Sequence, residues 1–526
     1  MARTFRALAV LLVAAFGARS LAAQTLSVDD PVLRAIWAQG MDSSRAYDLA
    51  QALMDSIGPR LNGSPAHHAA NEWAVARLRS WGVDARNEQY GTWRSWRRGI
   101  THLDLLTPRV RTLEATMLAW SPGVRGKVNG RVVALPELAD TVALAQWAAR
   151  NKDAFILISY AQPTCRPDSS YREFARPDTW DRMVAERTAG RAAWADRLQK
   201  LGGAATVQRV LDRAGVKGIL TNNWSQGWGV DKVFGAGTFK HPLGKAPALD
   251  VSCEDYGLLY RLAERGQGPT VRLEAEAEDL GEQPVYNTIG MIRGSTLPDE
   301  YVVLSAHYDS WDAGSGATDN GTGSTVMLEA MRILRAAYPH PKRTIMIGLW
   351  GGEEQGLNGS RAYAADHPEV VSGLQALFNQ DNGTGRIENI SAAGLIGPEQ
   401  AWASWIARLP AEVTRDFRIT FPGIPAGGGS DMASFVCYGA PSFGVGSLNW
   451  EYFLYTWHTN RDTFDKVVFD EIKNNAVLVA SLAYLASEHP ERLPRDRRVL
   501  PMGRNGQQMT WPECTAPARS SVESPR

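Results

Sequence analysis

The chain has 526 residues, a length that predicts two domains with accessory segments rather than one hydrophobic core. Lysine plus arginine and aspartate plus glutamate number 56 each, so the formal net charge is zero. Nucleic acids and anionic membranes are bound by strongly basic surfaces, and this composition therefore favours neither as a partner.

Residues 1–23 are expected to form a secretory signal peptide. Two early arginines precede an apolar stretch over residues 8–16, and small residues lie just before Gln24. This three-part layout is typical of an export signal, and the apolar stretch is too short to span a bilayer. No other stretch is long and apolar enough to do so. We therefore expect a secreted or periplasmic protein without a membrane span; the alternative is an ordinary amphipathic first helix.

The four cysteines fit export but leave their pairing open. They could form up to two disulfides, and no C-x-x-C pair indicates redox chemistry. A bridge between Cys165 and Cys253 is one alternative, and free buried thiols are the other. Cys437 lies in an apolar, strand-like stretch, where we expect a core position.

Helices are predicted over residues 46–57 and 66–81, where apolar residues recur at helical spacing, and strands over 90–113. His67 and His68 lie at the start of the second helix. We expect surface or capping positions for them rather than metal ligation, because neither belongs to the strand-end residues described below.

Strand-like stretches recur beyond residue 127, at residues 128–135 and 155–160, and a helix followed by a turn is predicted over 207–218. Between them, residues 163–201 form a mixed-charge segment that contains Trp180 and Trp194. This segment is either a helical lid or a solvated helix pair, and mixed-charge runs favour the second interpretation.

The chemistry is expected to centre on residues 301–319. An apolar run over 302–306 ends in His307-Tyr308-Asp309, a Gly-rich loop leads to Asp319, and a helix is predicted over 325–337. Such a run is typical of a buried parallel strand. Ligands bind in the crevice beyond the carboxyl ends of such strands, so His307 and Asp319 are candidates for a site there.

Two later strands end in the same way. Residues 344–350 run into Glu353-Glu354, residues 376–379 run into Asp381, and His458 follows later in the chain. Imidazole and carboxylate suit zinc and its neighbours, and a bridging carboxylate between two ions is a recurring hydrolytic design. Taken singly these residues could be a core histidine, a plain turn and a pair of helix-start acids. Unrelated turns would not reproduce the whole ligand set, so we favour a metal centre.

Five segments in this order resemble the M28 family of zinc exopeptidases, and within it the carboxypeptidase Q branch: H-x-D, D-N-G, G-E-E-x-G, a strand-end Asp and H-T-x-x-D-T. Residues 57–65, IGPRLNGSP, are similar to the amino-terminal signature of that family. The stretches AGVKGILTNN and APALDVSCEDYGLLYRL resemble a protease-associated (PA) domain. The resemblance implies an α/β fold: a mixed, mainly parallel sheet sandwiched by helices, with an inserted β-rich PA domain.

The same resemblance implies an order of domains along the chain. After the signal peptide come a first part of the peptidase domain over 24–126, the inserted PA-like domain over 127–275 and a second part of the peptidase domain with the metal site over 276–495. Residues 496–526 show little periodicity at the end of the chain, and we expect a flexible tail there.

The resemblance also implies two zinc ions. One would be held by His307, Asp319 and Asp381 and the other by Asp319, Glu354 and His458, with Asp319 as the bridge. Shared and additional carboxylates offset the repulsion between two close cations. Such ions lower the pKa of bound water from about 15.7 towards 7, which makes that water the expected nucleophile.

Glu353 is the expected general base, because adjacent residues at a strand end point to opposite sides and only one of the two glutamates needs to ligate. Asp309 lies two residues after His307 and is a candidate to accept its imidazole N–H. Asp462 could do the same near His458, or cap a turn.

We therefore expect an exopeptidase acting on dipeptides or short peptides, as in carboxypeptidase Q. An aminopeptidase of the same family is one alternative, and a catalytically silent receptor or binding protein is another. The motifs G-x-S-x-G and H-E-x-x-H are absent, which argues against a serine hydrolase and a thermolysin-like protease. Ser430 and Arg461 are speculative anchors for a substrate carboxylate. The resemblance alone implies a homodimer.

Overall fold

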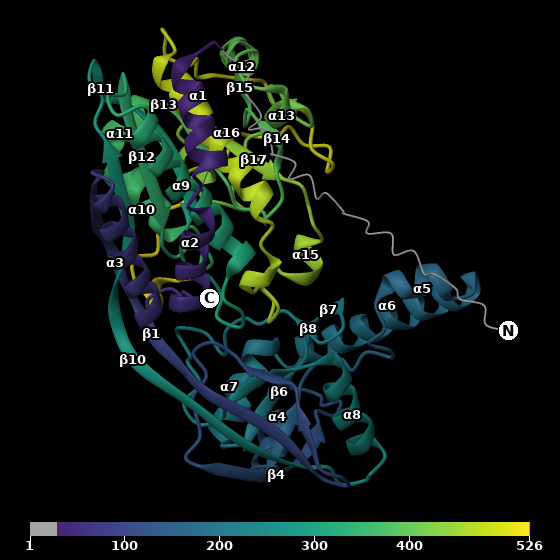
Figure 1. Cartoon of the computed structure of the whole chain (residues 1–526). Coiled ribbons are helices and arrows are strands. Elements are labelled where there is room, and N and C mark those ends of the chain that lie inside the picture. Colours follow the sequence, from purple (N-terminus) through teal and green to yellow (C-terminus); the bar gives the residue numbers. More distant parts are fainter. Residues whose placement is uncertain (1–28, 525–526) are drawn as a thin grey trace, which may run out of the picture.

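Two lobes are joined by two long strands in the computed structural model, which describes residues 29–524 (Figure 1). Strands β1 (Asp84–Thr107) and β10 (Thr270–Ile292) pair antiparallel and run from one lobe into the other. The predicted signal peptide over residues 1–23 lies outside the described residues.

The upper lobe of Figure 1 is built on parallel strands. Strands β12 (Arg343–Trp350), β11 (Leu297–His307), β13 (Leu374–Asn379) and β17 (Ser442–Ser447) lie side by side in that order, and each neighbouring pair is parallel. β14 (Ile387–Ser391) joins β17 antiparallel, and β10 joins β12 antiparallel. The predicted mixed, mainly parallel α/β sheet is confirmed.

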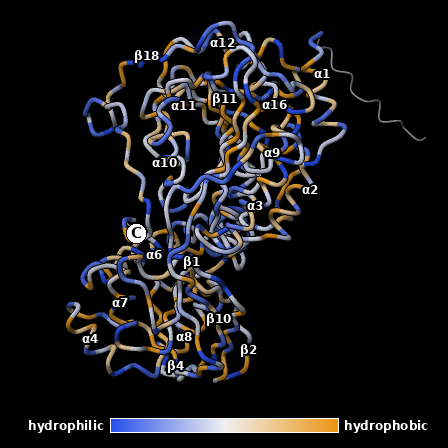
Figure 2. The backbone as a smooth tube through the Cα atoms, turned by 90° about the vertical axis from the view of Figure 1, so that its left-hand side faces the viewer, coloured by the Kyte–Doolittle hydropathy of each residue, from blue (hydrophilic) through white to orange (hydrophobic). Residues whose placement is uncertain are grey.

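Both faces of this sheet are covered by helices. Val302 and Leu304 of β11 belong to the core cluster that contains α9 (Thr322–Ala337) and α16 (Phe469–Glu488). Val303 belongs to a separate cluster on the other face, with residues of α10 (Asn358–Asp366) and α11 (Pro368–Gly373). Because both faces are buried, the strand is continuously apolar, and Figure 2 shows this hydrophobic middle of the upper lobe in orange.

The lower lobe has its own parallel strands: β4 (Lys127–Ala134), β5 (Ala154–Leu157), β6 (Gly218–Thr221) and β9 (Ala248–Val251). They lie with helices α4 (Thr141–Ala149), α7 (Ala204–Ala214) and α8 (Cys253–Glu264). β4 pairs with β10, so hydrogen bonds run through both lobes without a break. β10 crosses residue 275, and the domain boundaries stay a prediction.

The segment 163–201 forms a helix pair that projects from the lower lobe (Figure 1). α5 (Asp168–Phe174) has no buried residue, whereas α6 (Pro177–Lys200) buries Met183, Arg187 and Trp194. Most of its polar residues face water, in agreement with the expected solvated pair.

Shorter elements complete the described chain. The helices are α1 (Pro31–Trp37), α2 (Ala46–Gln51), α3 (Pro65–Ser80), α12 (Pro398–Ile406), α13 (Ala411–Thr414), α14 (Ala433–Val436) and α15 (Tyr452–Tyr455), with π or 3₁₀ turns η1 (Ala38–Asp42), η2 (Ala52–Ile57), η3 (Ala317–Gly321), η4 (Phe464–Lys466) and η5 (Ser521–Glu523). The strands are β2 (Arg111–Leu113), β3 (Ala115–Met117), β7 (Trp224–Gly227), β8 (Val230–Asp231), β15 (Leu395–Ile396), β16 (Arg418–Thr420) and β18 (Asp496–Arg497). None of the helices in residues 29–524 combines the length and hydropathy of a bilayer span.

All four cysteines are paired. Cys165 bonds to Cys253 and Cys437 bonds to Cys514. The core position expected for Cys437 is wrong: this residue is half-buried just after α14, and its sulfur reaches the C-terminal segment.

The C-terminal segment does not fit the prediction of a flexible tail over 496–526. Within residues 496–524, β18 pairs with β15, and the backbone N–H of Ala518 donates to Asn358 Oδ1 at 2.9 Å. The Cys437–Cys514 bond ties the middle of the segment to the upper lobe. The sequence offered no periodicity here because this segment packs through single contacts rather than as a long element.

We predict that substituting both Cys437 and Cys514 by serine lowers the free energy of unfolding by about 2–4 kcal/mol, because the bond closes a long loop. Chemical denaturation measures this change, and limited proteolysis tests the location. The matched control is the Cys165/Cys253 double serine variant, which should leave residues 497–524 as protected as in the wild type. Equal cleavage of this segment in both variants would contradict the assignment.

The His367 side chain links α10 and α11 to β1, through hydrogen bonds to Glu88 and Glu369. Burial lowers the pKa of His367, but the bonds to the two carboxylates outweigh burial and raise it above its ordinary value. The stabilisation is therefore complete below the unfolded pKa, about 6.5, and is lost as the pH rises through the higher folded pKa.

We expect His367→Gln to reduce the free energy of unfolding more at about pH 6 than at about pH 8.5. Urea denaturation of both proteins at the two pH values provides the measurement. A difference that is the same at both values would show that the imidazolium does not contribute.

Candidate metal centre

The candidate residues gather at the carboxyl edge of the upper sheet. His307 is the last residue of β11, Glu353 and Glu354 follow β12, and Asp381 follows β13. These neighbouring parallel strands deliver their ends to one edge. Two loop residues, Asp319 in η3 and His458 after α15, join them there.

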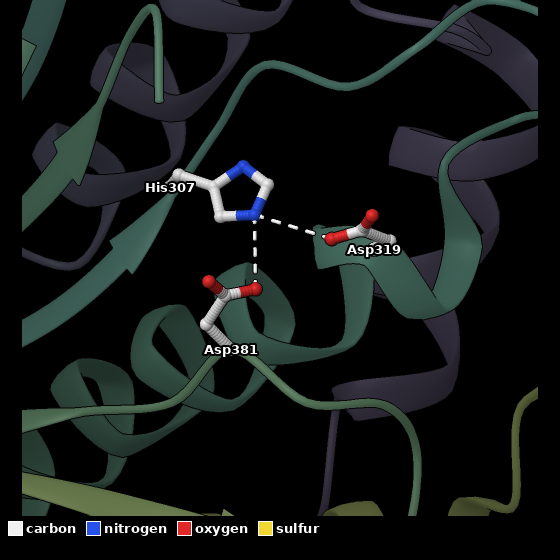
Figure 3. Close-up of side chains that lie close together, drawn as sticks. All are labelled: His307, Asp319 and Asp381. Atoms are coloured by element: carbon white, nitrogen blue, oxygen red, sulfur yellow. Dashed lines mark hydrogen bonds and ion pairs between the residues drawn. The ribbon is translucent and has the colours of Figure 1, made fainter. Parts of the chain in front are cut away.

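A first group consists of His307, Asp319 and Asp381. His307 Nε2 lies 3.0 Å from Asp381 Oδ1 and 3.3 Å from Asp319 Oδ1, as Figure 3 shows. The three side chains come from separate segments and point toward one another. Their ligand atoms lie within 4.8 Å of one another, which is close enough to share one metal ion.

A second group consists of Asp319, Glu354 and His458. His458 Nε2 lies 3.1 Å from Asp319 Oδ2 and 2.9 Å from Glu354 Oε2. Asp319 therefore faces one imidazole with each of its two oxygens. The two groups meet only through this carboxylate.

Asp309 acts differently from the prediction. His307 Nδ1 lies 3.0 Å from the backbone carbonyl of Asp309, whereas the Asp309 carboxylate is 3.8 Å away. That carboxylate instead accepts the backbone N–H groups of Glu353 at 3.1 Å and Glu354 at 3.3 Å. Because the Asp309 carboxylate faces the end of β12, it fixes the turn that carries both Glu353 and Glu354.

Asp462 supports Asp319 rather than His458. Its carboxylate accepts the backbone N–H groups of Thr318 at 2.7 Å and Asp319 at 3.1 Å. His458 Nδ1 has no hydrogen-bond partner within the described chain. The H-T-x-x-D-T segment thus supplies one candidate ligand and also holds the backbone of another.

Arg60 is a further supporting residue, and sequence reasoning did not single it out. It is fully buried, and its guanidinium donates to the carbonyls of Tyr308, Gly58, Ser315 and Gly316 at 2.8–3.0 Å. It thereby ties the end of β11 to the loop that leads into η3. The sequence signal that could have identified Arg60 is its place in the IGPRLNGSP stretch.

The lower lobe also reaches the centre. His458 has a left-handed backbone conformation, with φ at 59°, which is costly for a residue with a Cβ. Its carbonyl accepts the Val233 N–H at 2.9 Å, and the Phe234 ring meets the imidazole edge-on at 5.3 Å. Nearby, the Asn460 backbone N–H donates to the Asp231 carbonyl, and the Asp231 backbone N–H donates to Asn460 Oδ1. No local sequence pattern could predict these contacts, because residues 231–234 and 458–460 lie far apart in the chain.

Negative charge is in excess at this centre. Burial and the charge of Asp319 raise the pKa of Glu354 to about 7. Burial and the charges of Asp381 and Glu354 raise that of Glu353 well above its ordinary value, against the opposing charge of His307. Burial lowers the pKa of His458, but the two carboxylates beside it outweigh burial and raise the value to about 10. A bound cation would relieve this repulsion.

An open cleft of about 750 Å³ leads to the centre. Glu353, Asp381 and His458 line it, together with Ser430, one of the two expected carboxylate anchors. Arg461, the other, is not part of this lining and instead pairs with Glu114 of the lower lobe.

The expected surface position is wrong for His67, which is buried at 1% exposure, whereas His68 is exposed. Burial lowers the pKa of His67 to about 3, so its ring is neutral. Neither residue belongs to the two candidate groups.

Comparison with known proteins decides the family. Residues 287–483, which contain every residue of the two groups, match the model of peptidase family M28. These residues are a peptidase family M28 domain. This M28 peptidase is therefore a metallopeptidase, and the family prediction is confirmed.

Curated relatives of this M28 peptidase include carboxypeptidase Q. The Mus musculus protein is 26% identical over 458 residues, which cover 87% of this chain and 88% of the mouse protein. The Homo sapiens protein is 25% identical over 458 residues, with the same shares. Both alignments run through both lobes.

Solved structures agree. A peptidase M28 precursor from Shewanella amazonensis SB2B has a TM-score of 0.62 at 26% identity and covers 88% of this chain and 97% of its own. A zinc aminopeptidase from Bacillus subtilis has a TM-score of 0.52 at 19% identity, with shares of 86% and 98%, and this likeness concerns the fold alone.

We predict that Asp462→Asn weakens metal binding by roughly 10- to 100-fold, because the amide group replaces one of the oxygens that receive the Thr318 and Asp319 N–H groups. Competition with a chromogenic chelator measures the affinity. Asp465→Asn is the matched control, since Asp465 is exposed and pairs only with its neighbours Thr463 and Lys466. Equal affinities of the two variants would exclude the supporting role of Asp462.

Proposed function

We propose that this M28 peptidase is a di-zinc exopeptidase that hydrolyses dipeptides or short peptides. The observation that carries the proposal is the pair of ligand groups that share Asp319. Two further findings support it: the relatives named carboxypeptidase Q, and the fold shared with a zinc aminopeptidase. We propose His307, Asp319 and Asp381 as ligands of one ion, and Asp319, Glu354 and His458 as ligands of the other.

The residues present fit zinc. Imidazole nitrogen and carboxylate oxygen are ligands that zinc accepts. Glu354 Oε1 is buried and has no hydrogen-bond partner within residues 29–524, although an unpaired buried carboxylate oxygen is costly. Each oxygen of Asp319 faces a different imidazole, an arrangement that suits a bridging ligand.

When bound, the zinc ions would lower the pKa of water and polarise the scissile carbonyl. Glu353 lines the cleft beside the proposed ligands, where its carboxylate can take a proton from water and return it to the leaving amine. Asp309 acts as a positioning residue, because it holds the backbone N–H groups of both Glu353 and Glu354.

The relatives support two directions of peptide cleavage. Cleavage at the carboxyl end agrees with carboxypeptidase Q, and cleavage at the amino end with the aminopeptidase neighbour. We favour dipeptide-like substrates with a free carboxylate. We also infer that the protein is exported, from the layout of residues 1–23, and that it acts as a homodimer, as the family resemblance implies.

Two adjacent glutamates give a matched test of the mechanism. We predict that Glu353→Gln lowers kcat for dipeptide hydrolysis by roughly 10²- to 10⁴-fold and retains its zinc, because only proton transfer is lost. Glu354→Gln should instead lose zinc, because a ligand is removed.

Zinc content by mass spectrometry and hydrolysis of free, amino-blocked and carboxyl-blocked dipeptides provide the two readouts. Loss of zinc in Glu353→Gln, or full activity of that variant, would refute the assignment of the base. A wild type that binds two zinc ions yet cleaves no peptide would favour a binding protein.

A further inference from the structure

Arg361 stands out among the residues that line the cleft, because it is the single Lys or Arg side chain among the described lining residues. It lies in the first turn of α10, directly after the turn that carries Glu353 and Glu354. Acids dominate the rest of the lining near the metal centre. A positively charged side chain cannot serve as a ligand of a metal cation. Arg361 therefore calls for a different role in the cleft.

Contacts within the protein use only part of the hydrogen-bonding capacity of the Arg361 guanidinium. Its Nη1 donates to the Gly356 carbonyl at 2.8 Å, and within residues 29–524 it forms no ion pair with an acid. A guanidinium stays charged under all ordinary conditions and has five N–H donors in a planar fork that matches a carboxylate. Most of these donors remain available to a ligand in the cleft.

The position of Arg361 agrees with one end of the substrate. Glu353 and Asp431 are the acids whose charges act on the half-buried guanidinium and oppose the lowering of its pKa by burial. Under the proposed function, Glu353 returns a proton to the leaving amine. In a carboxy-terminal residue, a single carbon atom separates that amine from the free carboxylate. The carboxylate of the leaving residue is therefore the substrate group that lies on the Arg361 side.

The C-terminal segment bounds the same side. Arg361, Gly427 and residues 512–515 line a small cavity next to the cleft, and the Cys437–Cys514 bond holds this wall in place. Glu513 belongs to that wall but forms no ion pair with Arg361 in the described chain. Arg361 therefore lies between the cleft and a wall that the C-terminal segment helps to build.

We propose that Arg361 binds the free carboxylate of the leaving residue and thereby makes the enzyme select peptides at their carboxyl end. This inference rests on the proposed function and adds the residue and the substrate end that the comparisons leave open. Arg361 takes the place of Ser430 and Arg461 as the principal anchor. Ser430 Oγ accepts the Asn379 N–H at 2.7 Å and lines the same cleft, so it can assist.

The test compares a dipeptide with a free carboxylate and the same dipeptide as its amide, using the full zinc-loaded enzyme. A charge-assisted, bidentate contact predicts that the wild type prefers the free acid by roughly 10- to 100-fold in kcat/KM. Arg361→Met should lose this preference mainly through a higher KM for the free acid, so that it cleaves acid and amide about equally well. Arg361→Lys should retain part of it, which excludes a folding defect.

Two further variants sharpen the outcome. Arg182→Met carries the same substitution at an exposed position of α6 and should keep the wild-type preference. Lys232 is the rival cation, because its ammonium lies 3.9 Å from the ring centroid of Trp457, which lines the cleft. Loss of the preference in Lys232→Met instead of Arg361→Met would overturn the proposal.

The inference and the proposed function fail in different ways. If the wild type cleaves acid and amide equally well, or if Arg361→Met reduces both by the same factor, the carboxylate anchor falls while the exopeptidase stands. If the wild type cleaves neither substrate with zinc bound, the proposed function falls and the anchor falls with it.

Discussion

Buried negative charge is crowded at one edge of the upper sheet, and much of the surrounding fold is arranged around it. Carboxylates of Asp319, Asp381, Glu353 and Glu354 converge on two imidazoles, and burial raises the cost of each unpaired charge. The Asp309 and Asp462 carboxylates accept the backbone N–H groups of the segments that carry Glu353, Glu354 and Asp319. Arg60 donates to four carbonyls around the loop that leads to Asp319. The fold thereby fixes the candidate ligands in place, and a bound cation would offset the negative charge that remains.

The two lobes share this centre. His458 is presented from a strained backbone, and the bonds that hold that backbone come from residues 229–234 of the lower lobe. Strained conformations persist where the surroundings determine them, and here those surroundings belong to the lower lobe. β1 and β10 carry the chain out to the lower lobe and back, so this lobe is anchored through two paired strands (Figure 1). The lower lobe therefore acts on the geometry of the site and is more than an appended module.

The cleft presents two kinds of group to a peptide substrate. Its lining holds the acids and the His458 imidazole, together with the Arg361 guanidinium and Gly428, Gly429 and Ser430 of a Gly-rich loop. The carboxyl of Asp431, the next residue of that loop, is fully buried. The C-terminal segment, fixed by a disulfide, lines a small neighbouring cavity that shares Arg361 with the cleft. Under the proposed function, recognition of the end of the peptide then falls to Arg361.

Local sequence pattern was sufficient to predict the sheet edge and its chemistry. His307 ends an apolar strand, Glu354 and Asp381 lie shortly after two others, and neighbouring parallel strands end at the same edge of a sheet. Which side chain supports which ligand depends instead on tertiary contacts. The Asp309 carboxylate turns away from His307 toward the β12 turn, and Asp462 turns toward Asp319. Disulfide pairing, the docked tail and the contact between the lower lobe and the His458 loop join residues that are distant in the chain. Such contacts depend on packing in space, and the periodicity of a local sequence pattern carries no information about them.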